Sequence, residues 1–117
     1  MNLPDLSRSM VQCKSDLDDA MREYDRAIRE DADKDRAAKV AKARAYIAAA
    51  GPVAERQALV DLETADAQYE ARLAEGMKRS ASQAIESHRQ WMSALQSLAS
   101  LTRAEAALAR YESRETA

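Results

Sequence analysis

Glycine and proline stand next to each other at a single place in this chain, Gly51 and Pro52, near the middle of its 117 residues. Glycine is favoured directly after the last turn of a helix because it accepts positive φ. Proline is favoured in the first turn because its missing N–H would be unpaired there. The pair therefore predicts that one long helix ends and a second begins at this point. We expect the first helix over residues 5–50 and the second over residues 52–101 or 52–110.

The rest of the chain contains almost nothing that would interrupt a helix. Two glycines and two prolines are too few turn-forming residues for a sheet protein of this length. Hydrophobic residues make up 46% of the chain, but many of them are alanine and there is no phenylalanine, so the material for a thick globular core is missing. The composition predicts one all-α domain over residues 1–117, a thin helical rod that buries more surface by oligomerising.

Apolar residues recur in alternating steps of three and four, which is the spacing of the two core positions in a coiled coil. The N-terminal row comprises Leu3, Leu6, Met10, Cys13, Leu17, Ala20, Tyr24 and Ala27. The C-terminal row comprises Ala84, His88, Trp91, Leu95 and Leu98. A flanking row with a spacing of seven comprises Ile85, Met92 and Ala99. We expect the N-terminal and C-terminal rows to be buried against a partner helix.

An antiparallel hairpin that turns at the Gly-Pro pair would place residue x beside residue 103 − x. The two leucine-rich ends then meet, because residues 3–21 face residues 82–100. Near the turn, the cations of residues 36–44 would face three carboxylates. These carboxylates are Asp61, Glu63 and Asp66. We predict a long, coiled-coil-like antiparallel helical hairpin, and the same pairing would be satisfied between two chains.

Two further features could divide the second helix. Gly76 is a candidate for a kink because glycine weakens a helix. The segment from Thr102 to Glu105 fits a capping box, which would start a separate C-terminal helix or tail over residues 102–117. Once the hairpin closes, the end of the chain overshoots the N-terminal helix, which leaves Leu108 and Tyr111 to dock elsewhere.

The side chains that most enzymes use are scarce in this chain. His88 is the only histidine and Cys13 the only cysteine, so a catalytic triad, a redox pair and a cysteine-rich metal site all lack partners. Three aspartates have the spacing of calcium-loop ligands, but an arginine follows where that loop needs glycine. The three are Asp31, Asp33 and Asp35. We expect no enzyme activity, no cofactor and no metal site.

Charge and hydropathy limit the surroundings in which the protein works. Twenty acidic and 18 basic residues give a net charge of −2, which excludes a strongly basic nucleic-acid binder but leaves room for local basic patches. No window approaches the ~20 consecutive apolar residues of a membrane span, and the N-terminal residues show no signal peptide. A single cysteine agrees with a reducing compartment. We expect a cytoplasmic protein that does not contact a membrane.

A basic segment just before the turn is the most distinctive candidate surface. It carries four cations and no acid within nine residues, and a tyrosine follows. Its members are Arg36, Lys39, Lys42, Arg44 and Tyr46. The cations can contact phosphates while the tyrosine ring stacks on an unpaired base. The alternative is neutralisation by the carboxylates across the hairpin, but Arg44 points away from Lys39 and Lys42 around a helix, so some positive charge should face solvent.

This basic segment resembles part of the UvsY-type recombination mediators of tailed bacteriophages. Lys42, Ala43, Arg44 and Tyr46, in the stretch AAKVAKARAYIAAAG, are similar to the Lys-Ala-Arg segment that ends the family's first long helix. The order of parts over residues 30–112 is also similar. An acidic first helix is followed by the basic segment, a glycine-containing break, a long helix with a tryptophan and an arginine-rich end, here TRAEAALARYES.

The resemblance implies a helical, ring-forming phage protein that binds single-stranded DNA, weakens the hold of the single-strand-binding protein and helps to load a recombinase. Carried over to this chain, Lys42 and Arg44 would contact DNA. The C-terminal helix with Leu101, Ala104, Leu108 and Tyr111 would serve subunit assembly. The candidate oligomerisation residues are then Trp91, Leu95, Leu98, Leu101, Leu108 and Tyr111.

A second hypothesis belongs to another class of protein. A phage-encoded helical adaptor or inhibitor would bind a host or phage protein through the overshooting tail and would ignore DNA. A purely structural coiled coil is a third hypothesis. Salt-sensitive binding of an oligonucleotide by an oligomer would favour the mediator over both.

Overall fold

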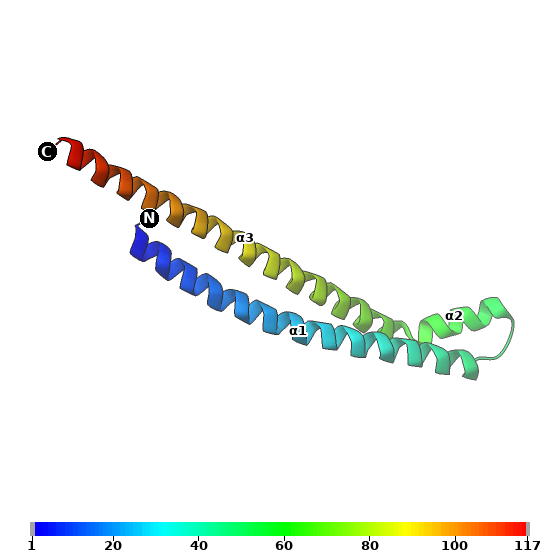
Figure 1. The fold of residues 1–117 in the computed structure, drawn as a ribbon. Coiled ribbons are helices and arrows are strands. Elements are labelled where there is room, and N and C mark those ends of the chain that lie inside the picture. The colour runs from blue at the N-terminus through cyan, green and yellow to red at the C-terminus, as the bar shows by residue number, and fades with distance from the viewer. Residues whose placement is uncertain (1, 117) are drawn as a thin grey trace. The chain divides into compact units, whose positions relative to one another are not determined.

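The computed structural model describes residues 2–116, and they form three α-helices and no strand: α1 (Leu3–Ala48), α2 (Val53–Glu63) and α3 (Ala65–Thr116) (Figure 1). The prediction of an all-α helical hairpin is confirmed. None of the described helices combines the length and apolarity needed to cross a membrane. The chain forms two compact units, which we describe separately.

The turn between α1 and α2 lies where the sequence predicted it. Gly51 has φ of 110°, a region that side chains with a Cβ rarely adopt. Pro52 is the N-cap of α2 and not its first helical residue, so α2 begins at Val53, one residue later than expected. The carbonyl of Pro52 accepts the first hydrogen bond of the helix, from the backbone N–H of Arg56 at 2.9 Å.

The second half of the hairpin is interrupted at Thr64 and not at Gly76. Thr64 is buried, and its hydroxyl donates a hydrogen bond of 2.7 Å to the carbonyl of Val60. Threonine can bond back to its own helix in this way, and such bonds often bend helices. Gly76 lies inside the continuous α3, where the predicted kink is absent. The single helix expected after the turn is therefore two helices.

The unit that contains both chain ends joins α1 up to Met21 with α3 from Gln83. Its core consists of Leu6 and Cys13 from α1 and Leu95 and Ala99 from α3, with Leu3, Met10 and Met92 packed against it. Cys13 also donates a thiol hydrogen bond to the carbonyl of half-buried His88, with Sγ and O 3.4 Å apart. The two segments run antiparallel, as expected, and the N-terminal row is buried or half-buried as predicted.

The predicted C-terminal row is wrong by one position. Ile85, Met92 and Ala99 face the core, whereas Trp91 is 54% and Leu98 41% exposed. The two rows are adjacent on α3 and equally apolar. Both use His88 and Leu95 as the other core position of the coiled-coil repeat. The buried row is the one with the smaller side chains, and a bulky indole in the interface would hold the two helices further apart.

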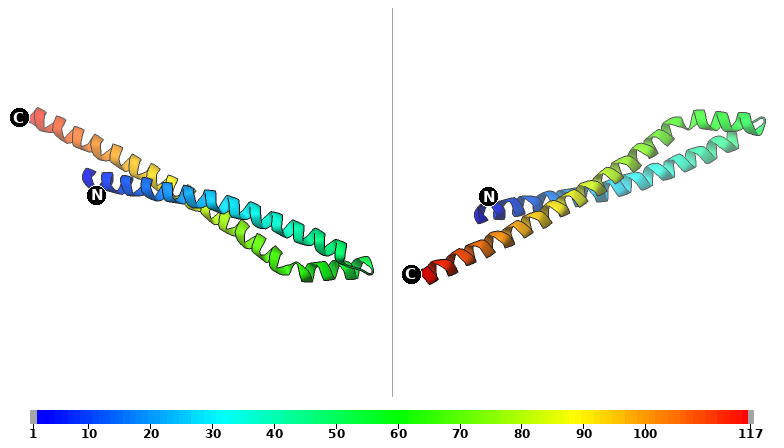
Figure 2. Two further views of the ribbon diagram at one scale, coloured as in Figure 1. Left: turned by 90° about the horizontal axis from the view of Figure 1, so that it is seen from below. Right: turned by 90° about the horizontal axis from the view of Figure 1, so that it is seen from above.

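The second unit, Arg22–Ser82, contains α2 and the facing parts of α1 and α3, seen from two sides in Figure 2. Its buried hydrophobic residues are Ala27, Ala38, Ala45, Val60 and Ala74. These small side chains allow close helix contact but bury little apolar area. An ion pair between Lys78 and Asp31, with Nζ and Oδ2 2.8 Å apart, lies among them and links α3 to α1 within one chain.

Two contacts between the helices lie close to the prediction that residue x lies beside residue 103 − x. That relation places residue 90 opposite Cys13, where the observed partner is His88. It places residue 57 opposite Tyr46, where the observed partner is Arg56. These two contacts deviate by two residues or fewer, whereas Asp31, for which the relation gives residue 72, pairs with Lys78.

The last part of α3 extends past the N-terminal end of α1 (Figure 1). Every side chain from residue 103 to residue 115 is exposed, and we call this part the C-terminal extension. The helix continues without a break through Thr102, whose hydroxyl donates to the carbonyl of Leu98, one turn earlier in the same helix, at 2.9 Å. The separate helix suggested over residues 102–117 is therefore not formed within the described residues.

Candidate nucleic-acid interface

The basic segment lies on α1 near the turn, and all four of its cations are exposed. Lys39 forms an ion pair with Asp35 one helical turn earlier, with Nζ and Oδ2 2.9 Å apart. The hydrogen bond and the charge of Asp35 together raise the pKa of Lys39. Within the part of the chain that the structure describes, Arg36, Lys42 and Arg44 form no ion pair. Three positive charges therefore face solvent without a carboxylate partner.

The carboxylates expected to neutralise the basic segment do not contact it. The described residues include no ion pair between any of the four cations and Asp61, Glu63 or Asp66. Asp61 instead accepts a hydrogen bond from the side chain of Gln57 within α2, at 3.3 Å. Because α2 ends at Glu63 and α3 begins at Ala65, the helix phase assumed in the prediction is not continuous across these three carboxylates.

The cations of the basic segment lie on two sides of α1. At about 100° per residue, Lys42 and Arg44 are about 160° apart around the helix axis. The half-buried Ala41 and the buried Ala45, which face the other helices of the hairpin, lie between these two directions. Lys42 and Arg44 therefore border different surfaces.

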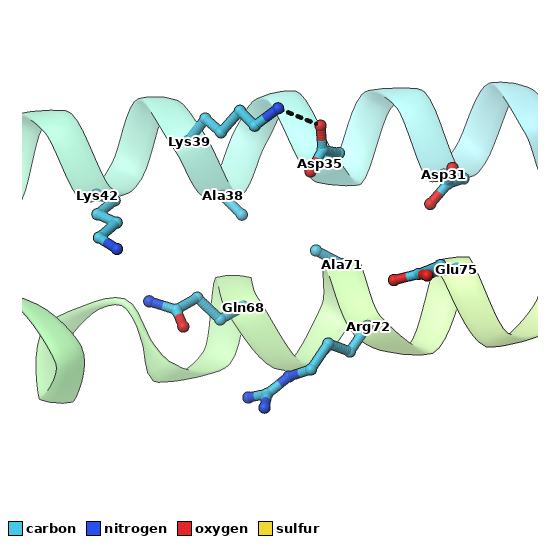
Figure 3. Close-up of a pocket in the computed structure, with 9 residues that line it drawn as sticks. All are labelled: Asp31, Asp35, Ala38, Lys39, Lys42, Gln68, Ala71, Arg72 and Glu75. Atoms are coloured by element: carbon cyan, nitrogen blue, oxygen red, sulfur yellow. Dashed lines mark ion pairs between the residues drawn. The ribbon is translucent and has the colours of Figure 1, made fainter.

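Lys39 and Lys42 border a groove between α1 and α3, shown in Figure 3. We call it the interhelical groove. Its lining residues are Asp31, Asp35, Ala38, Lys39, Lys42, Gln68, Ala71, Arg72 and Glu75. In Figure 3 Lys42 and Ala38 point toward α3 and Ala71 points toward α1, whereas Gln68 extends along α3 and the Arg72 side chain extends away from α1. The floor is thus made of small side chains, with polar groups at its edges.

The carboxylates of the interhelical groove already have cationic partners. Asp31 pairs with Lys78 at 2.8 Å and Asp35 with Lys39 at 2.9 Å. Glu75 pairs with Arg79 at 2.9 Å. Lys42 and Arg72 have no carboxylate partner among the described residues. The groove is therefore bordered by one such cation from each helix, of which Lys42 points toward α3 and Arg72 points away from α1.

Arg36 and Arg44 border a second, shallow groove on the surface of α1 alone. The remaining lining residues are Asp33, Ala37, Val40 and Ala41. Two arginines here flank an apolar strip, and Val40 is 39% exposed. This surface can attract an anion but offers no group from a second helix.

Part of the Tyr46 ring is covered by a residue that the sequence analysis did not identify, Arg56. The guanidinium carbon of Arg56 lies 4.6 Å from the centre of the Tyr46 ring, and its Nη2 donates to the Tyr46 carbonyl at 3.1 Å. This cation–π contact covers one face of the ring and leaves a 40% exposed side chain. The predicted pairing of residue x with residue 103 − x places residue 57 beside Tyr46. It could therefore have drawn attention to Arg56, the residue next to it.

The candidate oligomerisation residues divide into two groups. Five of them are exposed on α3: Trp91, Leu98, Leu101, Leu108 and Tyr111. Leu95 is only 2% exposed because it belongs to the core that also contains Leu6 and Cys13. We call the five exposed residues the exposed apolar row. Leu95 is not accessible to a second subunit while the hairpin is closed.

The structure provides no candidate metal site in the described residues. Two of the three aspartates with calcium-loop spacing, Asp31 and Asp35, are engaged by lysines. Searches with this chain against protein-family models, curated proteins and solved structures give no match.

Proposed function

We propose that this protein binds single-stranded DNA as a phage recombination mediator, in the cytoplasm of the host cell. The observation that carries the proposal is the exposure of Arg36, Lys42 and Arg44, which have no carboxylate partner among the residues that the structure describes. Unpaired surface cations attract phosphates, and the release of counterions from the nucleic acid makes the binding favourable. The nearby Tyr46 side chain is 40% exposed, so part of its ring can stack on a base.

The net charge of −2 is compatible with DNA binding if several subunits act together. One subunit offers few phosphate contacts and would bind weakly. In an oligomer, neighbouring sites rebind the same strand at high effective concentration, so affinity rises steeply with the number of subunits. The exposed apolar row on α3 offers the apolar surface that such an assembly would bury.

The test is fluorescence anisotropy with a labelled oligothymidylate at about 50 and 200 mM salt. The wild-type protein should bind and should lose affinity at the higher salt. Lys42→Ala combined with Arg44→Ala should weaken binding while leaving the helical circular dichroism unchanged. The matched control is Arg29→Ala, since Arg29 is an exposed α1 arginine outside the basic segment. Unchanged binding by the double variant would refute the assignment.

The mediator role needs a second readout, because many basic surfaces bind DNA. A mediator should accelerate the loading of a phage recombinase onto DNA that is already covered by a single-strand-binding protein. The double variant should lose this acceleration, and the Arg29 control should keep it. DNA binding without any effect on recombinase loading would restrict the function to single-strand binding.

A helical adaptor is the second candidate, and a specific observation favours it. The C-terminal extension carries Leu108 and Tyr111, which are 57% and 59% exposed. An amphipathic helix of this kind can lay its apolar side into a groove on another protein. Absence of oligonucleotide binding at the lower salt, together with a helical protein of intact fold, would favour the adaptor.

A further inference from the structure

We propose that the DNA strand binds along the interhelical groove, with Arg72 and Gln68 of α3 completing a site that Lys42 begins on α1. This inference rests on the proposed function and adds residues outside the basic segment. It also divides the basic segment into cations that contact the strand and cations that do not.

The electrostatics of the interhelical groove favour an anion. Each of its three carboxylates forms an ion pair, so none is left to repel a phosphate at full strength. Lys42 and Arg72 line the groove and have no carboxylate partner within residues 2–116. Lys42 faces the opening directly, and the exposed Arg72 side chain, which extends away from α1 in Figure 3, can reach a strand there by a change of rotamer. A strand in the groove can then be neutralised from both helices.

The floor of the groove allows a close approach of the strand. Ala38 and Ala71 face each other across it, and neither side chain extends beyond one methyl group (Figure 3). Gln68 is held in place because its Nε2 donates to the hydroxyl of Thr64 at 2.9 Å. Thr64 is itself buried, so the interruption between α2 and α3 fixes the orientation of this amide. The second N–H of the amide is left to donate to a phosphate oxygen.

Arg36 and Arg44 cannot take part in the same contact. They border the shallow groove of α1 with Asp33, on the other side of the buried alanines from Lys42. A strand in the interhelical groove is screened from them by α1 itself. Their charges contribute to long-range attraction, which is weak beyond about 8 to 10 Å at physiological salt. Lys42 should therefore matter more than Arg44, although both belong to the Lys-Ala-Arg segment.

The experiment compares four single variants of the full chain: Arg72→Ala, Lys42→Ala, Arg44→Ala and Arg29→Ala. Affinity for a labelled oligothymidylate is measured by anisotropy across a series of salt concentrations. Each lost phosphate contact should reduce the slope of log K against log salt by about 0.7 for single strands. We expect this reduction, with an affinity loss of roughly threefold or more at low salt, for Arg72→Ala and Lys42→Ala. The slope should not change for Arg44→Ala or Arg29→Ala.

The outcomes separate this inference from the proposed function. If Arg44→Ala reduces the slope and Arg72→Ala does not, the strand lies on the outer side of α1, and the groove site is refuted while DNA binding stands. If the wild-type chain does not bind the oligonucleotide at any salt, both proposals fail. Circular dichroism shows whether the Arg72 variant is folded, and Arg72→Lys should restore the slope because the contact needs only a positive charge.

Discussion

Lys78 of α3 donates a hydrogen bond to Asp31 of α1, with Nζ and Oδ2 2.8 Å apart. The position four residues before each of them is a buried alanine, Ala74 in α3 and Ala27 in α1. The two side chains are 36% and 20% exposed. A charged pair thus occupies the interface between the helices where small apolar residues would otherwise continue. A partly buried ion pair often contributes little net stability, but the loss of one partner leaves the other charge without compensation.

Asp31→Ala should therefore lower the thermal unfolding temperature more than the removal of both charges does. In Asp31→Ala the Lys78 ammonium stays partly buried without its acceptor. In the double variant, Asp31→Ala with Lys78→Met, no charge is left and the methionine packs against the alanines. Thermal unfolding followed by circular dichroism measures both. Equal destabilisation of the single and the double variant would contradict this interpretation.

The same pair predicts a pH dependence. The hydrogen bond and the charge of Asp31 raise the pKa of Lys78 above its usual 10.5. A group whose pKa is higher in the folded state stabilises that state fully below its unfolded pKa, and this stability is lost as the pH rises through the folded pKa. The stability that Lys78 adds to wild type, measured as the difference in unfolding temperature from Lys78→Met, should stay constant up to about pH 9.5 and decrease only above it. If this difference stays constant at higher pH as well, the Lys78–Asp31 pair is not the cause of the difference in unfolding temperature.

The two glycines should respond to alanine in opposite directions. Gly51 has φ of 110°, so Gly51→Ala should cost about 1 kcal/mol or more of unfolding free energy. Gly76 lies inside α3, and a Cβ there would meet nothing within 4 Å. Gly76→Ala should therefore stabilise the protein by about 1 kcal/mol. Urea unfolding measures both changes, and a destabilising Gly76→Ala would mean that this position is not an ordinary helical one.

Much of the fold could be predicted because its strongest signals are local. Gly51 and Pro52 have conformational preferences that need no partner, and the position of the turn then indicates approximately which residues face each other. Thr64 could not be recognised because a threonine inside a helical pattern has no local mark that its hydroxyl will bond back to Val60. Trp91 and Met92 belong to adjacent apolar rows, and only packing against α1 decides which row is buried.

The candidate site was less predictable because its chemistry comes from two helices. The exposed cations of α1 are visible in the sequence as a run without acids. Arg72 and Arg56 are not, since each gains its role from a groove or ring on α1. The neutralisation expected from Asp61 failed because most of the ion pairs described here, including the one that engages Lys39, form within a helix at spacings of three or four.

The choice of buried row on α3 can be tested with two leucines three residues apart. Leu95 is 2% exposed and Leu98 is 41% exposed. Leu95→Ala should cost about 2 to 4 kcal/mol of unfolding free energy, because it leaves a cavity beside Leu6 and Cys13. Leu98→Ala should cost less than about 1 kcal/mol at low protein concentration. Urea unfolding at the same concentration compares them, and a cost for Leu98→Ala as large as that for Leu95→Ala would restore the row that contains Trp91 to the core.

The exposed apolar row predicts self-association that depends on residues outside the core. Leu101 and Leu108 are 55% and 57% exposed and lie seven residues apart on one side of α3. Leu101→Glu combined with Leu108→Glu should lower the mass measured by light scattering, since two charges cannot be buried in an apolar contact. Helicity and the unfolding temperature of the dilute protein should not change, because neither side chain packs in the hairpin. Arg103→Glu is a control with the same introduced charge on the same helix, and a wild-type protein of monomer mass at high concentration would contradict the prediction.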